Sequence, residues 1–99
     1  MNDVRRQRLV VTVDTRPQLA RFVKLRHDPG RERWTLLAPE RVMTPDDIAI
    51  DVLKLCDGER TLGDIAAILS NDYDAPPEAI ADDLIELLQG LADDGYLKG

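Results

Sequence analysis

Few residues of this 99-residue sequence have the types and spacing that chemistry requires. The one histidine, His27, and the one cysteine, Cys56, stand apart, without the paired spacing that zinc and iron sites need. Cys56 falls at a core-facing position of a predicted helix, which favours a small buried hydrophobe over a nucleophile. We therefore expect no metal site, no cofactor and no catalytic cysteine.

Pairs of adjacent acidic residues are the remaining candidates for acid–base chemistry, and they lie at Asp46-Asp47, Asp82-Asp83 and Asp93-Asp94. Neighbouring residues on a helix point about 100° apart, and these pairs fall on predicted solvated faces. The six glycines are scattered singly, so no glycine-rich phosphate loop is present in the sequence. These patterns predict a protein that catalyses no reaction of its own.

The elements that would position a binding site begin with three predicted strands. Polar and apolar residues alternate over 21–28, Arg33–Leu37 is rich in aromatic, β-branched and apolar residues, and Arg41–Thr44 is a short strand before a proline. Asp28–Gly30 and Ala38–Glu40 supply turn residues between them. This pattern predicts a three-stranded antiparallel sheet in which Arg41–Thr44 is an edge.

Two predicted helices follow the sheet. The first is expected to begin with Thr44 as its N-cap and Pro45 as its first helical residue, and Gly58 supplies its stop. Thr61–Asp64 resembles a capping box with aspartate in place of glutamate, and it opens a second helix that ends near Tyr73.

The third predicted helix begins at Pro76 and carries apolar residues over about 160° of its circumference. That arc is wider than packing on one core requires. Part of it is therefore available to line a groove, although packing of Ile85 and Ala92 on neighbouring loops explains the excess equally well.

Length and composition predict one compact domain over residues 16–99, preceded by residues 1–15 as a flexible arm or a linker remnant, which would also suit a fused chain. A single cysteine, no charged-then-apolar leader and no long apolar run predict a cytoplasmic protein that does not associate with membranes.

Charge is distributed unevenly along the chain. Residues 1–44 carry ten Lys/Arg and five Asp/Glu, whereas residues 45–99 carry three and fourteen. Strands followed by helices in helix-turn-helix order are typical of winged-helix nucleic-acid binders, which is one candidate class. Residues 76–95 hold six acidic residues and no Lys or Arg, however, and an acidic helix does not suit a phosphate-lined groove. We expect no nucleic-acid partner.

The segment Leu36–Val42, with the sequence LLAPERV, resembles the PqqD family. Trp34 precedes it, and an acidic helix start and Cys56-Asp57-Gly58 follow it; the resemblance covers about residues 16–99. It implies an α+β, winged helix-turn-helix-like domain, with an N-terminal three-stranded antiparallel sheet followed by three helices.

The resemblance also implies a function. Similar domains are recognition elements for ribosomally made, modified peptides. A non-catalytic peptide chaperone of this kind would bind a PqqA-like precursor of pyrroloquinoline quinone and present it to a PqqE-like radical S-adenosylmethionine enzyme. In similar domains the peptide extends the sheet beside the third strand and packs against the third helix. Carried over, the peptide-binding residues are Arg41, Val42, Met43 and Thr44 at the edge and Ile80, Leu84, Ile85 and Leu88 along the cleft. A purely structural adaptor of the enzyme is the other alternative.

Overall fold

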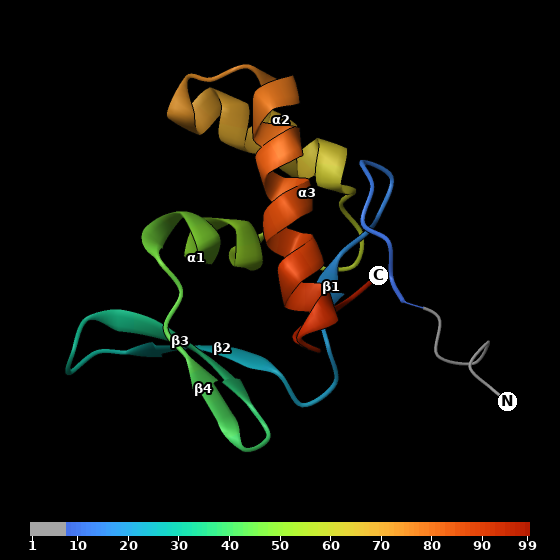
Figure 1. Ribbon diagram of the computed structural model, residues 1–99. Helices are drawn as coiled ribbons and strands as arrows, with labels where there is room; N and C mark the ends of the chain where they lie inside the picture. The colour runs from blue at the N-terminus through green and yellow to red at the C-terminus, as the bar shows by residue number, and fades with distance from the viewer. Residues whose placement is uncertain (1–7) are drawn as a thin grey trace, which may run out of the picture.

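The computed structural model describes residues 8–99 and contains five strands and three helices within them (Figure 1). The predicted α+β class, an N-terminal three-stranded antiparallel sheet followed by three helices, is confirmed. The elements are, in order, β1 (Gln18–Leu19), β2 (Lys24–Asp28), β3 (Arg33–Ala38), β4 (Arg41–Met43), α1 (Asp47–Lys54), α2 (Leu62–Tyr73), α3 (Pro77–Asp93) and β5 (Leu97–Lys98).

The main sheet has the antiparallel order β2-β3-β4, with β4 at one edge. Because side chains alternate across a sheet, its two faces differ in composition. Leu25, Leu36 and Met43 share a row, and Leu36 is completely buried, so this face packs on the core. The neighbouring row, which contains the exposed Val42, faces away from the core.

A second sheet was not predicted. β1 and β5 pair antiparallel, with Gln18 opposite Lys98 and Leu19 opposite Leu97. Each strand has only two residues, so neither carries a detectable alternation of polar and apolar side chains. Their pairing brings the chain that enters the main sheet next to the chain that leaves α3.

The predicted start of the first helix was wrong. Asp46, rather than Thr44, is the N-cap of α1: its carboxylate accepts a hydrogen bond from the Ala49 N–H at 2.8 Å. The helix then begins at Asp47, two residues after Pro45. An aspartate in extended conformation can satisfy an unpaired N–H of the first turn, and this local bond decides the position of the boundary.

Three further boundaries differ from prediction. β2 begins at Lys24 rather than at residue 21, because Phe22 has a positive φ of 69° and turns the chain before the strand. β4 ends at Met43 rather than Thr44. α1 ends at Lys54, before Gly58, which has a φ of +81° in the following turn rather than at the helix end.

The capping box of α2 is confirmed. The Thr61 hydroxyl accepts from the Asp64 N–H at 3.0 Å, and the Asp64 carboxylate accepts from the Thr61 N–H at 3.0 Å. Hydrogen bonds from Thr61 hold the pKa of Asp64 below its usual value. The helix ends at Tyr73 as predicted.

The core lies between the three helices and the inner face of the sheet, and its completely buried side chains include Leu36, Val52, Leu62, Ile65 and Leu88. Cys56 is buried as predicted, with its thiol directed at the Val52 carbonyl at 3.3 Å. Burial raises the pKa of this thiol to about 12, so it stays protonated at neutral pH.

Residues 8–15 lie against α2 and α3. The carbonyls of Val13 and Thr15 accept hydrogen bonds from the Gly63 and Leu62 N–H groups, which lack partners inside α2. Val11 is 5% exposed. The division at residue 15 into arm and domain stays a prediction, and residues 1–7 of that arm lie outside the described residues. None of the described helices is long and apolar enough to cross a membrane.

Candidate functional site

β4 presents a free edge. Within residues 8–99 it pairs with β3 alone, so no other strand of this part of the chain occupies its outer side. Val42 is 69% exposed and Thr44 is also exposed, whereas Met43 is half-buried against the core. An edge of this kind offers backbone N–H and C=O groups to an added strand.

Arg41 fixes this edge to the end of α3. Its Nη2 donates to the Asp94 carbonyl at 2.7 Å, and its guanidinium lies 4.6 Å from the centre of the Tyr96 ring. A cation suits the C-terminal end of a helix, where unpaired carbonyls gather. The side chain of Arg41 therefore holds β4 at the end of α3, and its charge is engaged there.

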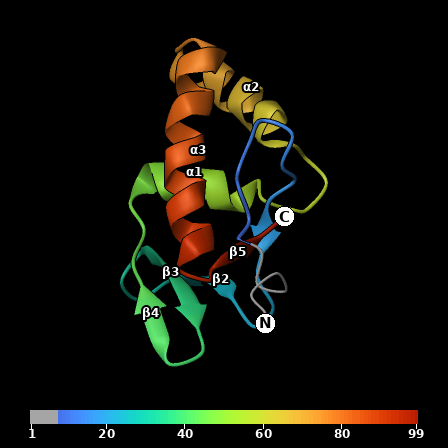
Figure 2. The same cartoon turned by 45° about the vertical axis from the view of Figure 1, so that its right-hand side comes forward.

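The four α3 residues of the predicted site do not lie on one surface. Leu84 and Leu88 are core residues, 3% and 0% exposed. Ile80 and Ile85 are half-buried and, at 100° per residue, point about 140° apart. β4 and the start of α1 lie on one side of α3, and the chain before β1 lies on the other (Figures 1 and 2).

The flank of α3 that carries Ile85 is the one next to residues 8–13. Ala92, seven residues from Ile85 and so on the same side of the helix, lines an open pocket of about 720 Å³ together with Leu9. Gln89 joins this flank to the chain, because its side chain donates to the Leu9 carbonyl at 2.8 Å and accepts from the Val11 N–H at 2.9 Å. The structure does not bring Ile85 together with Ile80 or β4.

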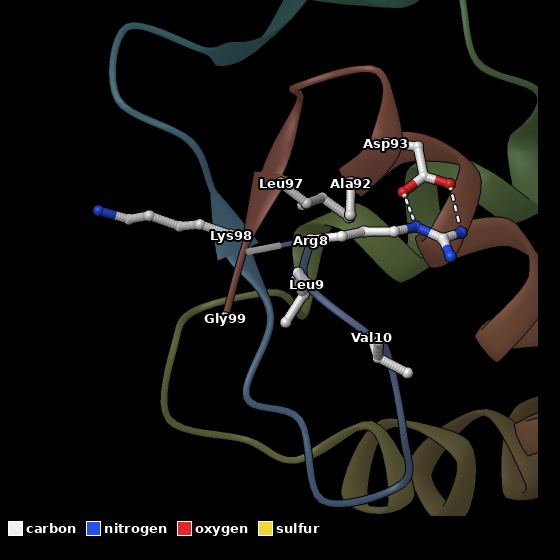
Figure 3. Close-up of a pocket in the computed structure, with 8 residues that line it drawn as sticks. All are labelled: Arg8, Leu9, Val10, Ala92, Asp93, Leu97, Lys98 and Gly99. Carbon is white, nitrogen blue, oxygen red and sulfur yellow. Dashed lines mark hydrogen bonds and ion pairs between the residues drawn. The ribbon is translucent and has the colours of Figure 1, made fainter. Parts of the chain in front are cut away.

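Figure 3 shows the ion pair at one end of this pocket. The Arg8 guanidinium makes two hydrogen bonds to the Asp93 carboxylate, at 2.8 and 2.7 Å, and holds the pKa of Asp93 below its usual value. Lys98 and Gly99 lie at the other end of the pocket. Its position beside residues 8–10 and the end of β5 sets it apart from the β4 edge.

The flank of α3 that carries Ile80 contains a different, apolar pocket of about 190 Å³. It is lined by Ile48, Leu69, Tyr73, Ile80, Asp83 and Leu84, which come from all three helices. Leu87, seven residues from Ile80, points within about 20° of it and is half-buried. The predicted Ile80 and Leu84 thus line one pocket, Leu87 points to the same side of α3, and the first turn of α1 reaches this pocket through Ile48.

Sequence reasoning missed Ile48, Tyr73 and Leu87 as members of this surface. Ile48 fits a core stripe if the first helix begins at Thr44, but in a helix that begins at Asp47 it lies in the first turn and is 57% exposed. Tyr73 is the last residue of α2 and is 45% exposed. A tyrosine at the predicted end of the second helix was the one signal available in the sequence.

The charged groups around this pocket are acidic. The Tyr73 hydroxyl donates to the Asp51 carboxylate, and this bond, together with the negative charges of Asp51, Asp72 and Asp47, raises the pKa of Tyr73. Asp83 lines the pocket itself. The rim therefore carries carboxylates contributed by all three helices.

This surface has the composition of a binding site. In the described part of the chain, no three His, Cys, Asp or Glu residues are grouped so that they could hold a metal ion. The apolar walls can bury side chains, and the free edge of β4 can form hydrogen bonds with another backbone. An extended segment that binds a protein uses both kinds of contact.

The described residues form a small α+β domain with an N-terminal antiparallel sheet, one edge of which is free, followed by three helices. The chain belongs to the PqqD family: residues 33–97 match the family described as coenzyme PQQ synthesis protein D.

Two curated relatives illustrate the family. The PqqA binding protein of Bradyrhizobium diazoefficiens is 53% identical over 87 residues, which cover 88% of this chain and 84% of the relative. The bifunctional coenzyme PQQ synthesis protein C/D of Methylorubrum extorquens is 48% identical over 82 residues, which cover 83% of this chain and 22% of that longer protein.

Two solved structures share the fold. The solution structure of the PqqD part of Methylobacterium extorquens PqqCD has a TM-score of 0.72 and 47% identity, over 84% of this chain and 88% of that one. That protein is described as a functional, stand-alone recognition element for ribosomally synthesized and post-translationally modified peptides. The crystal structure of PqqD from Xanthomonas campestris has a TM-score of 0.53 and 42% identity, over 85% and 93% of the two chains.

Proposed function

We propose that this chain binds the PqqA precursor peptide of pyrroloquinoline quinone biosynthesis as a strand added beside β4, and presents it to a radical S-adenosylmethionine enzyme without catalysing a reaction itself. One observation carries the proposal: Arg41 holds the free edge of β4 at the end of α3, and the chain after β4 leads directly to Ile48, which lines the apolar pocket on the Ile80 flank. The names of two relatives, both PqqA binding proteins, support PqqA as the peptide. The cytoplasm, where a ribosomally made precursor is first available, is the proposed location.

Typical interaction free energies indicate how much the β4 edge and the α3 helix each contribute to the affinity for the peptide. About four edge hydrogen bonds at roughly 0.5–1.5 kcal/mol each give ~2–6 kcal/mol. Micromolar affinity requires about 8 kcal/mol, and ordering a flexible peptide adds to that requirement. The remainder corresponds to two or more buried apolar side chains at roughly 1.5–3 kcal/mol each. The flank of α3 therefore sets the affinity, whereas β4 sets the direction and register of the peptide.

The residues that we assign follow from this division. The backbone of Arg41, Val42, Met43 and Thr44 pairs with the peptide. Ile80, Leu84 and Leu87 receive its side chains, and Leu88 supports them from the core. Ile85 faces the other flank of α3, and we propose that it contributes to folding rather than to the peptide contact.

Two matched variants test the assignment of the flank. Leu87→Gln and Ile85→Gln remove similar apolar volume from half-buried positions on opposite flanks of α3. We expect Leu87→Gln to weaken binding of the Bradyrhizobium diazoefficiens PqqA peptide about tenfold in calorimetry, and Ile85→Gln less than twofold. Unfolding curves of both variants check that each is folded. Equal loss in the two variants would reject this flank as the site.

Strand addition is tested separately, by isotope-edited spectra of the chain during titration with the same peptide. New protection and shifts of the amides of residues 41–44 are expected at saturation. Peptide binding that leaves these amides unmoved would contradict the role of β4. Val42→Pro, which removes an edge N–H, should then weaken binding, although Val42 is exposed and contributes little to the core.

Presentation to the enzyme has its own test. We expect the radical S-adenosylmethionine enzyme to bind the complex of chain and peptide. A purely structural adaptor would bind the enzyme and show no affinity for the peptide alone. We do not expect nucleic acid to be a ligand, since α3 contains no Lys or Arg. Retardation of generic duplex DNA at low salt would contradict that expectation.

A further inference from the structure

The apolar pocket between the three helices is small. Its volume of about 190 Å³ is below the roughly 300–1,000 Å³ typical of small-molecule sites, so it suits one side chain rather than a whole ligand. Two of its walls, Ile48 and Tyr73, are 57% and 45% exposed although both are large and apolar in body. Their exposure leaves the pocket open to a side chain that arrives from solvent.

The pocket lies in the continuation of the β4 edge. Thr44 is the first residue after β4, and Ile48 follows four residues later in the first turn of α1. Four residues span at most about 14 Å, so a strand that runs beside β4 and past Thr44 reaches the pocket within roughly four of its own residues. A side chain bound there would belong to the same peptide that pairs with β4.

Charge determines which peptide sequence fits. Asp83 lines the pocket, and the Tyr73 hydroxyl at its rim donates to the Asp51 carboxylate. Asp47 and Asp72 directly precede Ile48 and Tyr73, two residues of the pocket wall. The nearest described cation on α1, Lys54, is at the far end of the helix, 4.4 Å from the centre of the Trp34 ring. The rim thus favours a positive charge beside the buried side chain.

We propose that this pocket binds an aliphatic or aromatic side chain of the peptide, and that the carboxylates of Asp47, Asp51, Asp72 and Asp83 select a lysine or arginine next to that side chain in the peptide sequence. The inference rests on the proposed peptide-binding function and adds to it a chemical rule for the peptide: an apolar anchor flanked by a cation.

Charge reversal with a matched control tests the rule. Asp83→Lys and Asp82→Lys make the same change at adjacent exposed positions of α3, but Asp82 lies by Val13 and Gly63 on the other flank. We expect Asp83→Lys to weaken binding of the labelled PqqA peptide at least tenfold, and Asp82→Lys less than threefold. Equal effects of the two variants would mean general attraction by net charge, and would overturn the selection of a cation.

The peptide supplies the second arm of the test. Each lysine and arginine of the peptide is replaced by glutamine in turn and titrated against the wild-type chain and Asp83→Lys. One replacement should cost at least fivefold with the wild-type chain and nothing further with Asp83→Lys. If acetylation of the peptide's N-terminus gives that pattern instead, the cation is the terminal amine and the assignment to a side chain is wrong.

The apolar part of the rule is tested by Ile48→Gln, with Phe22→Gln as the control at another exposed apolar residue, 69% exposed. A loss of about tenfold is expected for Ile48→Gln alone. Wild-type affinity in both Ile48→Gln and Asp83→Lys, together with weak binding by Leu87→Gln, would reject the pocket and leave the proposed function standing. Absence of peptide binding by the wild-type chain would reject both.

Discussion

Single side chains make the two flanks of α3 different. Gln89 uses both ends of its amide on the backbone of Leu9 and Val11, so one flank is already joined to an extended segment of the chain. On the other flank Ile80 and Asp83 line an open apolar pocket. The apolar residues of α3 form one unbroken arc around the helix. Only these contacts show which part of that arc is covered by the chain itself and which part is open.

Gly90 gives a prediction at one residue. It lies exposed inside α3, and a Cβ added there would meet nothing within 4 Å. Gly90→Ala should therefore raise the free energy of unfolding by about 0.5–1 kcal/mol in urea titrations. Gly58→Ala is the contrasting change, because Gly58 has a φ of +81° and its Cβ would lie 3.0 Å from Gln18; it should lower stability by about 1 kcal/mol or more.

Cys56 gives a second prediction at this scale. Burial raises its pKa from the ordinary value of 9.0 to about 12, so the folded chain should react slowly with a disulfide reagent at pH 8 and the urea-unfolded chain quickly. The same shift contributes stability that is complete below about pH 9 and is lost as the pH rises toward 12. Fast labelling of the folded chain would contradict the burial of this thiol.

Among the elements, the segment before β1 can be tested with neighbouring valines. Val11 is 5% exposed and Val10 is 65% exposed, although the two are neighbours in the chain. We expect Val11→Ala to lower the free energy of unfolding by about 1–2 kcal/mol and Val10→Ala to change it by less than about 0.5 kcal/mol. Equal effects would indicate that residues 8–13 do not stay packed on the helices in solution and instead form the flexible arm that the sequence predicts.

The elements also show how far sequence reasoning reaches. The β2–β3–β4 order and the Thr61–Asp64 capping box were predicted because their signals are local: alternation, turn residues and a cap within four residues. The β1–β5 pair joins residues about eighty positions apart, and two-residue strands leave no pattern. The sequence could not predict which flank of α3 carries Ile85, because that depends on residues 8–13, which are far from α3 in the sequence and pack beside it.

For the molecule as a whole, the carboxylates set the response to acid. Hydrogen bonds from backbone N–H groups and a nearby arginine lower the pKa values of Asp57, Asp64 and Asp93 in the folded state. A lowered folded pKa contributes stability that is present above about pH 4 and lost as the pH falls through the folded value.

We therefore expect the midpoint of urea unfolding to fall below about pH 4, and the fall to be shallower in Asp64→Asn, whose side chain cannot titrate. The control is Asp82→Asn, at an exposed position of α3 whose side chain forms no hydrogen bond or ion pair among the described residues. If the wild-type chain and Asp64→Asn lose stability in parallel on acidification, the capping carboxylate does not carry this share of the pH dependence.

The β1–β5 pair has a topological consequence. It places Gly99 against Leu9, since a Cβ on Gly99 would lie 3.4 Å from a Leu9 methyl group, and both contact the same pocket (Figure 3). A short glycine-rich linker could therefore join residue 99 to residue 8, and new termini could be opened in the exposed turn at Pro39 and Glu40. Such a circular permutant would keep every helix contact while releasing one end of β4, so that the edge strand could be lengthened by residues of choice.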